Sequence, residues 1–210
     1  MAKNTSLPTT SYTADSAKNF VVGAGAVVQD FKYDKEKGAY TYKALGATSG
    51  GSKISLKTEM RQMEIDGILS TPVGGDMVDS AEGTMELSFL EHNLEKFKMA
   101  LIGNIITASA DDVFEAGTEY VKPTSQILEE NYVPGLAHIS KLSSGDFLVV
   151  RFDYAICTEG LEMEPQDKND NTLSVTFAAR TDPDNLEDAS LPVKVAVIKK
   201  STLKGSEVRA

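Results

Sequence analysis

The chain has 210 residues, 41% of them hydrophobic and 25% charged, with a formal net charge of −10. This composition predicts one globular domain with a substantial core, and the acidic balance disfavours binding to nucleic-acid phosphates or to an anionic membrane surface. No stretch reaches the roughly 18 apolar residues of a membrane-spanning helix, and the polar N-terminus lacks the apolar core of a signal peptide. We therefore expect no membrane anchor and synthesis in a cytoplasm.

The N-terminal segment predicts an arm followed by strand-like runs. Residues 1–18 are rich in Ser, Thr, Ala and Lys without apolar periodicity, which is typical of an extended arm that orders only against a partner. The apolar runs that follow surround Gly23 and Gly25, whose spacing matches the start of a dinucleotide-binding fingerprint. Val28 stands where the third glycine belongs and no helix pattern follows, so small residues that permit close backbone approach are the better interpretation.

Residues 34–52 predict a long irregular excursion. They contain a charged tip, the aromatic pair Tyr40 and Tyr42, and the glycine-rich run GATSGG. Connections in compact domains usually have about 2 to 6 residues, and longer ones are commonly functional, so we expect this loop to make contacts. The run lacks the Lys-Ser/Thr pair of a phosphate-binding loop.

Residues 59–103 predict two alternating strands, joined by a glycine-rich connection and followed by a helix. Each strand would bury one face and show carboxylates to water, because successive strand side chains take opposite faces. The first strand places Met63 and Ile65 opposite Gln62, Glu64 and Asp66. The second places Met85, Leu87 and Phe89 opposite Thr84, Glu86 and Ser88. An alternative is a hairpin turn at Asp66 and Gly67, which would change part of the first set.

The helix is predicted over about residues 93–102. Leu94, Phe97 and Leu101 form its apolar stripe, Asn93 is a suitable N-cap, and Gly103 stands where a left-handed residue ends many helices. A helix this short must pack on the sheet, since it is not stable alone in water.

The second half of the chain predicts short strands up to Pro134 and then long alternating ones. Residues 147–159 form one predicted strand, with one face made of Leu148, Val150, Phe152, Tyr154 and Ile156 and the opposite face made of Val149, Arg151, Asp153, Ala155 and Cys157. Near it, Glu162 and Glu164 alternate with Leu161 and Met163. The next strand opposes Leu173, Val175, Phe177 and Ala179 to Thr172, Ser174, Thr176 and Arg180. A last strand covers residues 192–198.

These elements together predict a mainly β, antiparallel β-sandwich of about eight strands with one packed helix. The whole chain, 1–210, would be a single domain: an N-terminal arm over 1–18, the sandwich over 19–198 and a polar C-terminal tail over 199–210.

Catalytic and metal sites are not predicted. The single Cys157 excludes an internal disulfide and a thiolate cluster and indicates a buried structural thiol. His92 and His138 are isolated polar residues, and no nucleophile motif is present. Glu162 and Glu164 would lie about 6.6 Å apart along a strand, near the spacing of inverting glycosidases. Two solvated carboxylates are the simpler interpretation, because the sequence has no Trp for sugar stacking. We expect neither enzyme activity nor a cofactor.

The order of these features resembles the major tail tube proteins of long-tailed (siphovirus-type) bacteriophages. The resemblance lies in VVGAGAVV, the loop ending in GATSGGSKI, the segments EMRQMEIDGILSTPVGG and EGTMELSFLEHNLEKFKMALIG, and the strand LSVTFAARTDPDN. It implies hexameric rings that stack into a tube for DNA delivery, with arms and a long loop joining subunits and rings. It also implies contacts with a tape measure protein and with a tail terminator or distal tail protein, and a location in the virion tail after synthesis in the bacterial cytoplasm.

A tube would give the polar strand faces a role as the wall of a water-filled bore. Carboxylates and hydroxyls there would repel DNA or hold it weakly, so that DNA passes without specific binding. The predicted lumen-facing residues are Gln62, Glu64, Asp66, Glu86, Ser88, Glu162, Glu164, Thr172, Ser174 and Thr176. Arg151 and Arg180 depart from an acidic wall and are expected to pair with acids such as Asp153. The predicted contact residues between subunits or rings are Tyr40, Tyr42, Leu45, Gly46, Gly50 and Gly51.

Three other functions fit the same pattern. The inner tube of a contractile tail, a tailocin or a secretion system would share the architecture. A monomeric carbohydrate-binding β-sandwich would use its loops and form no ring, and a glycosidase would use Glu162 and Glu164.

Overall fold

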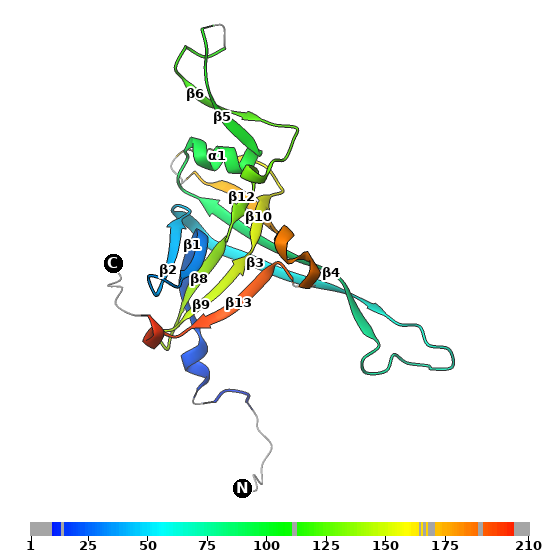
Figure 1. Cartoon of the computed structure of the whole chain (residues 1–210). Coiled ribbons are helices and arrows are strands. Elements are labelled where there is room, and N and C mark those ends of the chain that lie inside the picture. The colour runs from blue at the N-terminus through cyan, green and yellow to red at the C-terminus, as the bar shows by residue number, and fades with distance from the viewer. Residues whose placement is uncertain are drawn as a thin grey trace.

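The computed structural model describes residues 10–13, 15–110, 113–163, 165, 167, 171–188 and 191–203. Two antiparallel sheets pack face to face, and two hairpins project from them (Figure 1). Sheet A has the order β13 (Val193–Ile198), β9 (Phe147–Phe152), β8 (Ala137–Leu142), β1 (Val21–Asp34), β2 (Ala39–Ala44). Sheet B has the order β3 (Thr48–Gln62), β4 (Asp76–Phe89), β12 (Leu173–Arg180), β10 (Tyr154–Cys157), β7 (Val133–Pro134), with β11 (Glu162–Met163) beside β12.

The smaller elements lie at the ends of the sandwich. Helix α1 (Leu94–Leu101) packs against the hairpin of β5 (Gly103–Thr107) and β6 (Glu119–Pro123). Short 3-10 turns are η1 (Ser16–Asn19), η2 (Glu129–Asn131), η3 (Pro183–Asp188) and η4 (Lys200–Thr202). Among the described residues, no helix is long and apolar enough to cross a membrane. The prediction of an antiparallel sandwich with one helix is confirmed, although the described chain has more strands than the eight expected.

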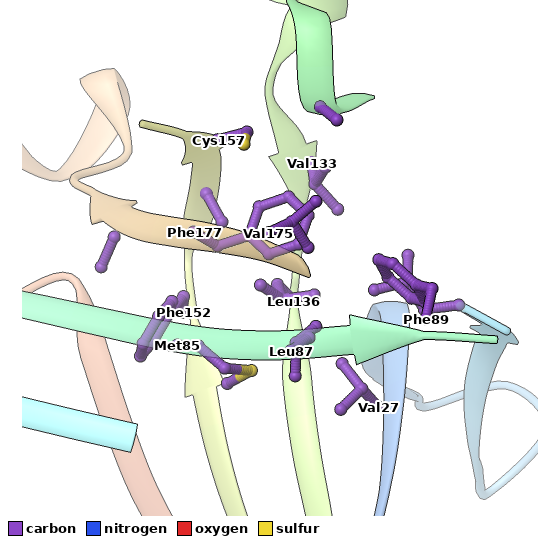
Figure 2. Packing of buried hydrophobic residues seen from close by; sticks show 14 of the residues in the cluster. Val27, Met85, Leu87, Phe89, Val133, Leu136, Phe152, Cys157, Val175 and Phe177 are labelled. Atoms are coloured by element: carbon purple, nitrogen blue, oxygen red, sulfur yellow. The ribbon is translucent and has the colours of Figure 1, made fainter. Parts of the chain in front are cut away.

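The core fills the space between the two sheets (Figure 2). Phe152 comes from sheet A and Phe89 and Phe177 from sheet B, and each side chain is at most 1% exposed. Burying a side chain of this kind contributes about 1.5–3 kcal/mol. Met85 and Leu87 are buried with them, so the predicted core face of β4 is confirmed.

The long run after residue 147 is two strands in different sheets, and the prediction of one strand was wrong. Strand β9 belongs to sheet A and β10 to sheet B, and the chain crosses between the sheets at Asp153. The alternation shifts there, because Phe152 and Ala155, which are three residues apart, both enter the core. Apolar residues continue on both sides of the crossing, so the sequence pattern does not mark it.

Asp153 fixes this crossing with buried polar contacts. Its side chain is 8% exposed, accepts a hydrogen bond from Arg151 and lies 2.9 Å from Lys194 Nζ on β13. Its backbone N–H donates to Pro192 O at 3.0 Å and its carbonyl accepts from Gly135 N at 2.8 Å. The expected pairing of Arg151 with Asp153 is thus confirmed, and the contacts of Asp153 connect β9 with β13 and with Gly135, the residue after β7.

We predict that Asp153→Ala lowers the free energy of unfolding by about 3–5 kcal/mol, because it leaves the guanidinium of Arg151 without its carboxylate in a largely buried place. The control is Lys194→Ala, which removes a partner that is 58% exposed and should cost about 1 kcal/mol or less. Urea denaturation measures the free energy of unfolding of both variants. Equal effects would show that Asp153 has no special role in the crossing.

Gly25 allows β1 and β8 to approach closely. A Cβ atom at this position would lie 2.7 Å from both His138 Nε2 and Ile139 O, and the backbone has φ +78°. His138 Nε2 also contacts Ala24 O at 3.0 Å, next to the bulge in the register of the two strands. The prediction that a small residue permits close backbone approach is confirmed at Gly25. Gly23 differs, since a Cβ there would meet nothing within 4 Å.

This difference gives a matched pair of variants. Gly23→Ala and Gly25→Ala both place a side chain at positive φ, which costs about 1–2 kcal/mol. Gly25→Ala should cost about 1–3 kcal/mol more, because it also overpacks the β1–β8 contact. Thermal or urea unfolding of both variants measures which loses more stability. An equal loss of stability in the two variants would contradict the close approach of β1 and β8 at Gly25.

Helix α1 begins as predicted and ends differently. Asn93 Oδ1 accepts from Lys96 N at 3.0 Å, which confirms the N-cap. The left-handed residue at the C-terminus is Ile102, with φ 50°, and the expectation that Gly103 has this role was wrong. Gly103 instead begins β5, where a Cβ would lie 2.7 Å from Lys122 O on the paired strand.

The excursion predicted for residues 34–52 is mostly regular structure. After a turn at 35–38 the chain forms β2, which pairs with β1, and β3 begins at Thr48. Strand β3 then pairs with β4 as far as Gln62 and Asp76. Residues 63–75 connect them at the end of a hairpin that projects far from the sandwich (Figure 1). The strand expected through residue 66 therefore ends at Gln62, and Asp66 and Gly67 form a turn, as the alternative proposed.

Candidate functional site

The face of sheet B that points away from the core is polar and defines the candidate site. Along β4, Met85, Leu87 and Phe89 turn inward, so that Glu86 and Ser88 lie on the outer face. Antiparallel pairing sets Thr176 opposite Glu86 and Ser174 opposite Ser88. Strand β11 adds Glu162 opposite Ser174. We call this surface the polar face; its residues are Lys53, Glu86, Ser88, Glu159, Glu162, Ser174 and Thr176.

Cross-strand contacts organise these side chains. Lys53 Nζ lies 2.5 Å from Glu86 Oε1, and the two residues pair across β3 and β4. The Ser88 and Ser174 hydroxyls are 3.3 Å apart. The Thr176 hydroxyl donates to the Glu159 carboxylate. Exposed ion pairs contribute about 0–1 kcal/mol, so the Lys53–Glu86 pair sets the character of the surface more than the stability of the fold.

The polar face is slightly hollow. A depression of about 450 Å³ is bordered by all seven of its residues and by Gly50 and Gly51 on β3. Three carboxylates and one ammonium group line it. Among the described residues, no group of three or more His, Cys, Asp or Glu side chains is arranged to hold a metal ion. The arrangement therefore offers an acidic, hydroxyl-rich wall.

Half of the predicted lumen residues meet on this face. These are Glu86, Ser88, Glu162, Ser174 and Thr176. Thr172 is half-buried immediately before β12. Glu164 lies outside the described residues. Lys53 and Glu159 also belong to the polar face and were not predicted. Lys53 lies there because β3 pairs with β4 in a register that sets it opposite Glu86, and alternation within one strand does not determine this register.

Gln62, Glu64 and Asp66 lie elsewhere. Gln62 is on the same alternation of β3 as Ile54, which faces the core, and its Oε1 accepts from Thr71 at 3.0 Å. Glu64 and Asp66 belong to the connection between β3 and β4. Glu64 borders a separate hollow at the end of the hairpin, and Asp66 lies in a turn. The predicted lumen residues of the two strands therefore do not share one surface, since β3 ends before Glu64 and Asp66.

The predicted contact residues have mixed environments. Tyr40 stacks on Phe31 with ring centroids 5.2 Å apart, whereas Tyr42 is 60% exposed. Leu45 is 1% exposed and belongs to the core, so its side chain offers no surface to another subunit. Gly46 lies against Lys96 and Glu91. Gly50 and Gly51 have open space where a side chain would be, and they border the polar face.

A large apolar surface was not anticipated. The connection 63–75 and the ends of β3 and β4, which we call the hairpin tip, carry large hydrophobic side chains in water. Leu69 and Val73 are 106% and 108% exposed. Met60 and Val78, a cross-strand pair, are 67% and 58% exposed. Met63 and Ile65, predicted to face a core, are 44% and 45% exposed. Exposed apolar clusters of this kind mark interaction surfaces.

The remaining candidates for chemistry have structural contacts. Both ring nitrogens of His138 are engaged, one by Ala24 O and one at 3.2 Å by the Ser140 hydroxyl. His92 Nδ1 lies 3.1 Å from Leu90 O. Cys157 is 3% exposed, and burial raises the pKa of its thiol, which disfavours the reactive thiolate. Arg180 Nη1 donates to Ala179 O at 2.8 Å.

Comparisons with known proteins give structural likenesses only. No family model matches the sequence. No curated protein matches it either. A solved structure described as the tail of an empty GTA particle with C6 symmetry is 7% identical, with a TM-score of 0.39, over 76% of this chain and 92% of that one. The virion of a native gene transfer agent (GTA) particle is 8% identical, with a TM-score of 0.35, over 74% and 92% of the two chains.

Proposed function

We propose that this chain is the structural subunit of a phage-type tail tube, in which hexameric rings stack around a bore that conducts DNA. The observation that carries the proposal is the polar face of sheet B, which continues directly to an unpaired edge. In the part of the chain that the structure describes, strand β3 (Thr48–Gln62) pairs on one side only, with β4. A long open edge is a template for pairing with another chain. Pairing between copies would extend sheet B around a ring and remove that edge.

A closed ring explains why the polar face is polar. If each subunit contributes β3, β4, β12 and β10, six copies form a barrel with more than the roughly 16–18 strands that already leave an aqueous channel. The outer face of sheet B would then become the wall of the bore. Glu86, Glu159 and Glu162 outnumber Lys53 there. DNA carries about one charge per 1.7 Å of its axis, so such a wall repels it and does not retain it.

The hairpin tip supports self-association over a solitary module. A monomeric carbohydrate-binding sandwich has no use for a ribbon that holds Leu69 and Val73 fully in water. A neighbouring subunit would cover these side chains. The sequence resemblance to siphovirus tail tube proteins adds the expected partners: further copies, a tape measure protein, and a tail terminator or distal tail protein at the tube ends. The location would be the virion tail.

Electron microscopy of the purified chain tests the assembly. We expect six-fold rings or tubes from the parent, and loss of both in Leu69→Glu/Val73→Glu, because charges would enter the covered surface. The unfolding free energy of the variant should stay within about 0.5 kcal/mol of the parent, as for other exposed substitutions. Ser70→Glu, at an exposed neighbouring position, is the control. A parent that remains monomeric at all concentrations would overturn the proposed function.

Charge reversal tests the position of the polar face. Tubes of Glu86→Lys/Glu162→Lys should retain short duplex DNA at low salt, release it as salt rises, and protect it from nuclease because it lies in the bore. The control, Glu36→Lys/Glu115→Lys, changes the same charge at two exposed residues outside sheet B. Parent tubes should retain no DNA. Retained DNA that nuclease digests freely would mean that the polar face is on the outside of the assembly.

A further inference from the structure

One edge of the sandwich exposes apolar side chains that belong to its core layer. In the described part of the chain, β13 is the edge of sheet A and β3 the edge of sheet B (Figure 1). Val195 lies opposite Val150, a core residue, and Val197 follows on the same side of β13. Both are more than half exposed, and Leu56 on β3 is 49% exposed. We call Leu56, Val195 and Val197 the apolar edge.

The apolar edge begins where the two sheets are still in contact. A Cβ atom at Gly83 of β4 would lie 2.8 Å from the Val193 side chain and 3.4 Å from the Leu56 side chain. Val193 packs against the core. Val197 is four residues further along β13, about 13 Å away at the usual rise of a strand. Beyond Gly83, β13 therefore keeps the side-chain pattern of a core strand while its valines are left in water.

The opposite edge of sheet B carries side chains of matching character. Strand β11 pairs with Ser174 on the side of β12 that does not pair with β4, so β11 lies at the edge away from β3. Met163 pairs with Leu173, a core residue, and is itself 38% exposed. Leu161 is 37% exposed, and Glu159 is exposed beside it. We call Glu159, Leu161 and Met163 the far edge.

The outer layers of the two edges have opposite charges. Lys53 and Lys57 lie on the outer face of β3, because both alternate with Ile54, which packs against the core. Glu159 borders the polar face on the other side of the sheet. Since Lys53 contacts Glu86 of its own subunit, the partner for Glu159 of another copy is Lys57. One copy cannot join these two charges, because β4 and β12 lie between them.

These charges favour one way of joining copies. Two β3 edges paired with each other would bring lysines together, and like charges opposite each other destabilise strand pairs. Two far edges would likewise bring glutamates together. A β3 edge against a far edge sets opposite charges in the outer layer and apolar side chains in the core layer. Such a contact is head-to-tail and closes into a ring when the rotation between copies closes.

We propose that the far edge of one copy covers the apolar edge of the next copy and completes its core. Leu161 and Met163 would pack over β13 of the neighbour. Glu159 would face Lys57 in the outer layer. The inference rests on the proposed function, since it names the side chains that close the ring. Each core would then be shared between two copies, and its apolar edge would be buried only after association.

Two variants that each disable one edge test the contact. Val195→Glu/Val197→Glu disables the apolar edge, and Leu161→Glu/Met163→Glu disables the far edge. Each variant alone should stay monomeric, whereas their mixture should form 1:1 dimers, because one intact edge of each kind remains. Native mass spectrometry with one variant ¹⁵N-labelled measures the composition. The control, Ala196→Glu, adds a charge to the opposite face of β13 and should still form rings.

The outcomes separate this contact from the proposed function. Rings from the parent, together with only monomers in the mixture, would overturn the contact and leave the proposed function intact. Rings or dimers from either double variant alone would do the same. A parent that stays monomeric at all concentrations would overturn both proposals.

A milder pair of variants replaces any charged variant that unfolds at a lower urea concentration than the parent. Val195→Thr/Val197→Thr and Leu161→Gln/Met163→Gln keep the size of the side chains and lose apolar burial. Each should weaken ring formation about tenfold or more. Unchanged ring formation in both would contradict the contact.

A charge swap tests the outer layer separately. Lys57→Glu and Glu159→Lys should each weaken ring formation about threefold or more, and the combination should restore most of it. The controls are Lys35→Glu and Glu36→Lys, which change the same charges in the exposed turn between β1 and β2. Weakening in both single variants without restoration in the combination would mean that Lys57 and Glu159 do not meet.

Photo-cross-linking identifies the surface that the far edge covers. Met163→benzoylphenylalanine places a photoreactive side chain in the far edge, and the protein is mixed from ¹⁵N-labelled and unlabelled copies. Cross-links should join labelled with unlabelled peptides and should include the tryptic peptide 195–199 of β13. Cross-links confined to peptides of the same isotope, or to peptides outside β3 and β13, would overturn the inference.

Discussion

The rest of the structure depends on one constraint, the burial of a single face of sheet B against sheet A. Met85, Leu87 and Phe89 on β4 and Val175 and Phe177 on β12 fill the core. Because strand side chains alternate, the residues between them must face outward. Glu86, Ser88, Ser174 and Thr176 are therefore gathered into one surface by the same packing that holds the two sheets together. Core and polar face are two consequences of one register.

The sequence was sufficient where a feature depends on local alternation within one strand. The inward set on β4 and the N-cap Asn93 follow from spacing alone and are confirmed. It was insufficient where a feature depends on which strands pair. Gln62 and Glu86 occupy similar places in two alternating patterns, but β3 alternates without a shift from Lys53 to Gln62, whereas β4 has a bulge opposite Glu59 and Met60. Gln62 consequently lies on the opposite face of β3 from Lys53, and the predicted lumen residues of β3 and β4 are divided between two surfaces.

Changes of sheet are also invisible to periodicity. At Asp153 the chain leaves sheet A for sheet B without a glycine, a proline or a polar run. Asp153 was predicted to lie on the strand face opposite Phe152, yet its carboxylate is buried and contacts Arg151 and Lys194. Leu45 was likewise assigned to a contact loop and lies in the core, because its backbone N–H donates to Val27 O at 3.1 Å and draws the segment onto β1. Long-range partners decide both cases.

The β3–β4 hairpin extends beyond the core that stabilises its base. At the base, Gly83 lies under Val193, where a Cβ would be 2.8 Å from the valine side chain, so the ribbon is held tightly as it leaves the sandwich. Beyond that point, Met60 and Val78 pair in water. A two-stranded ribbon alone is only marginally stable, and exposed apolar area costs about 25 cal/mol per Å². A surface that covers the ribbon would bury its apolar side chains and thereby stabilise the pairing of its two strands. The order of the hairpin tip is therefore coupled to association.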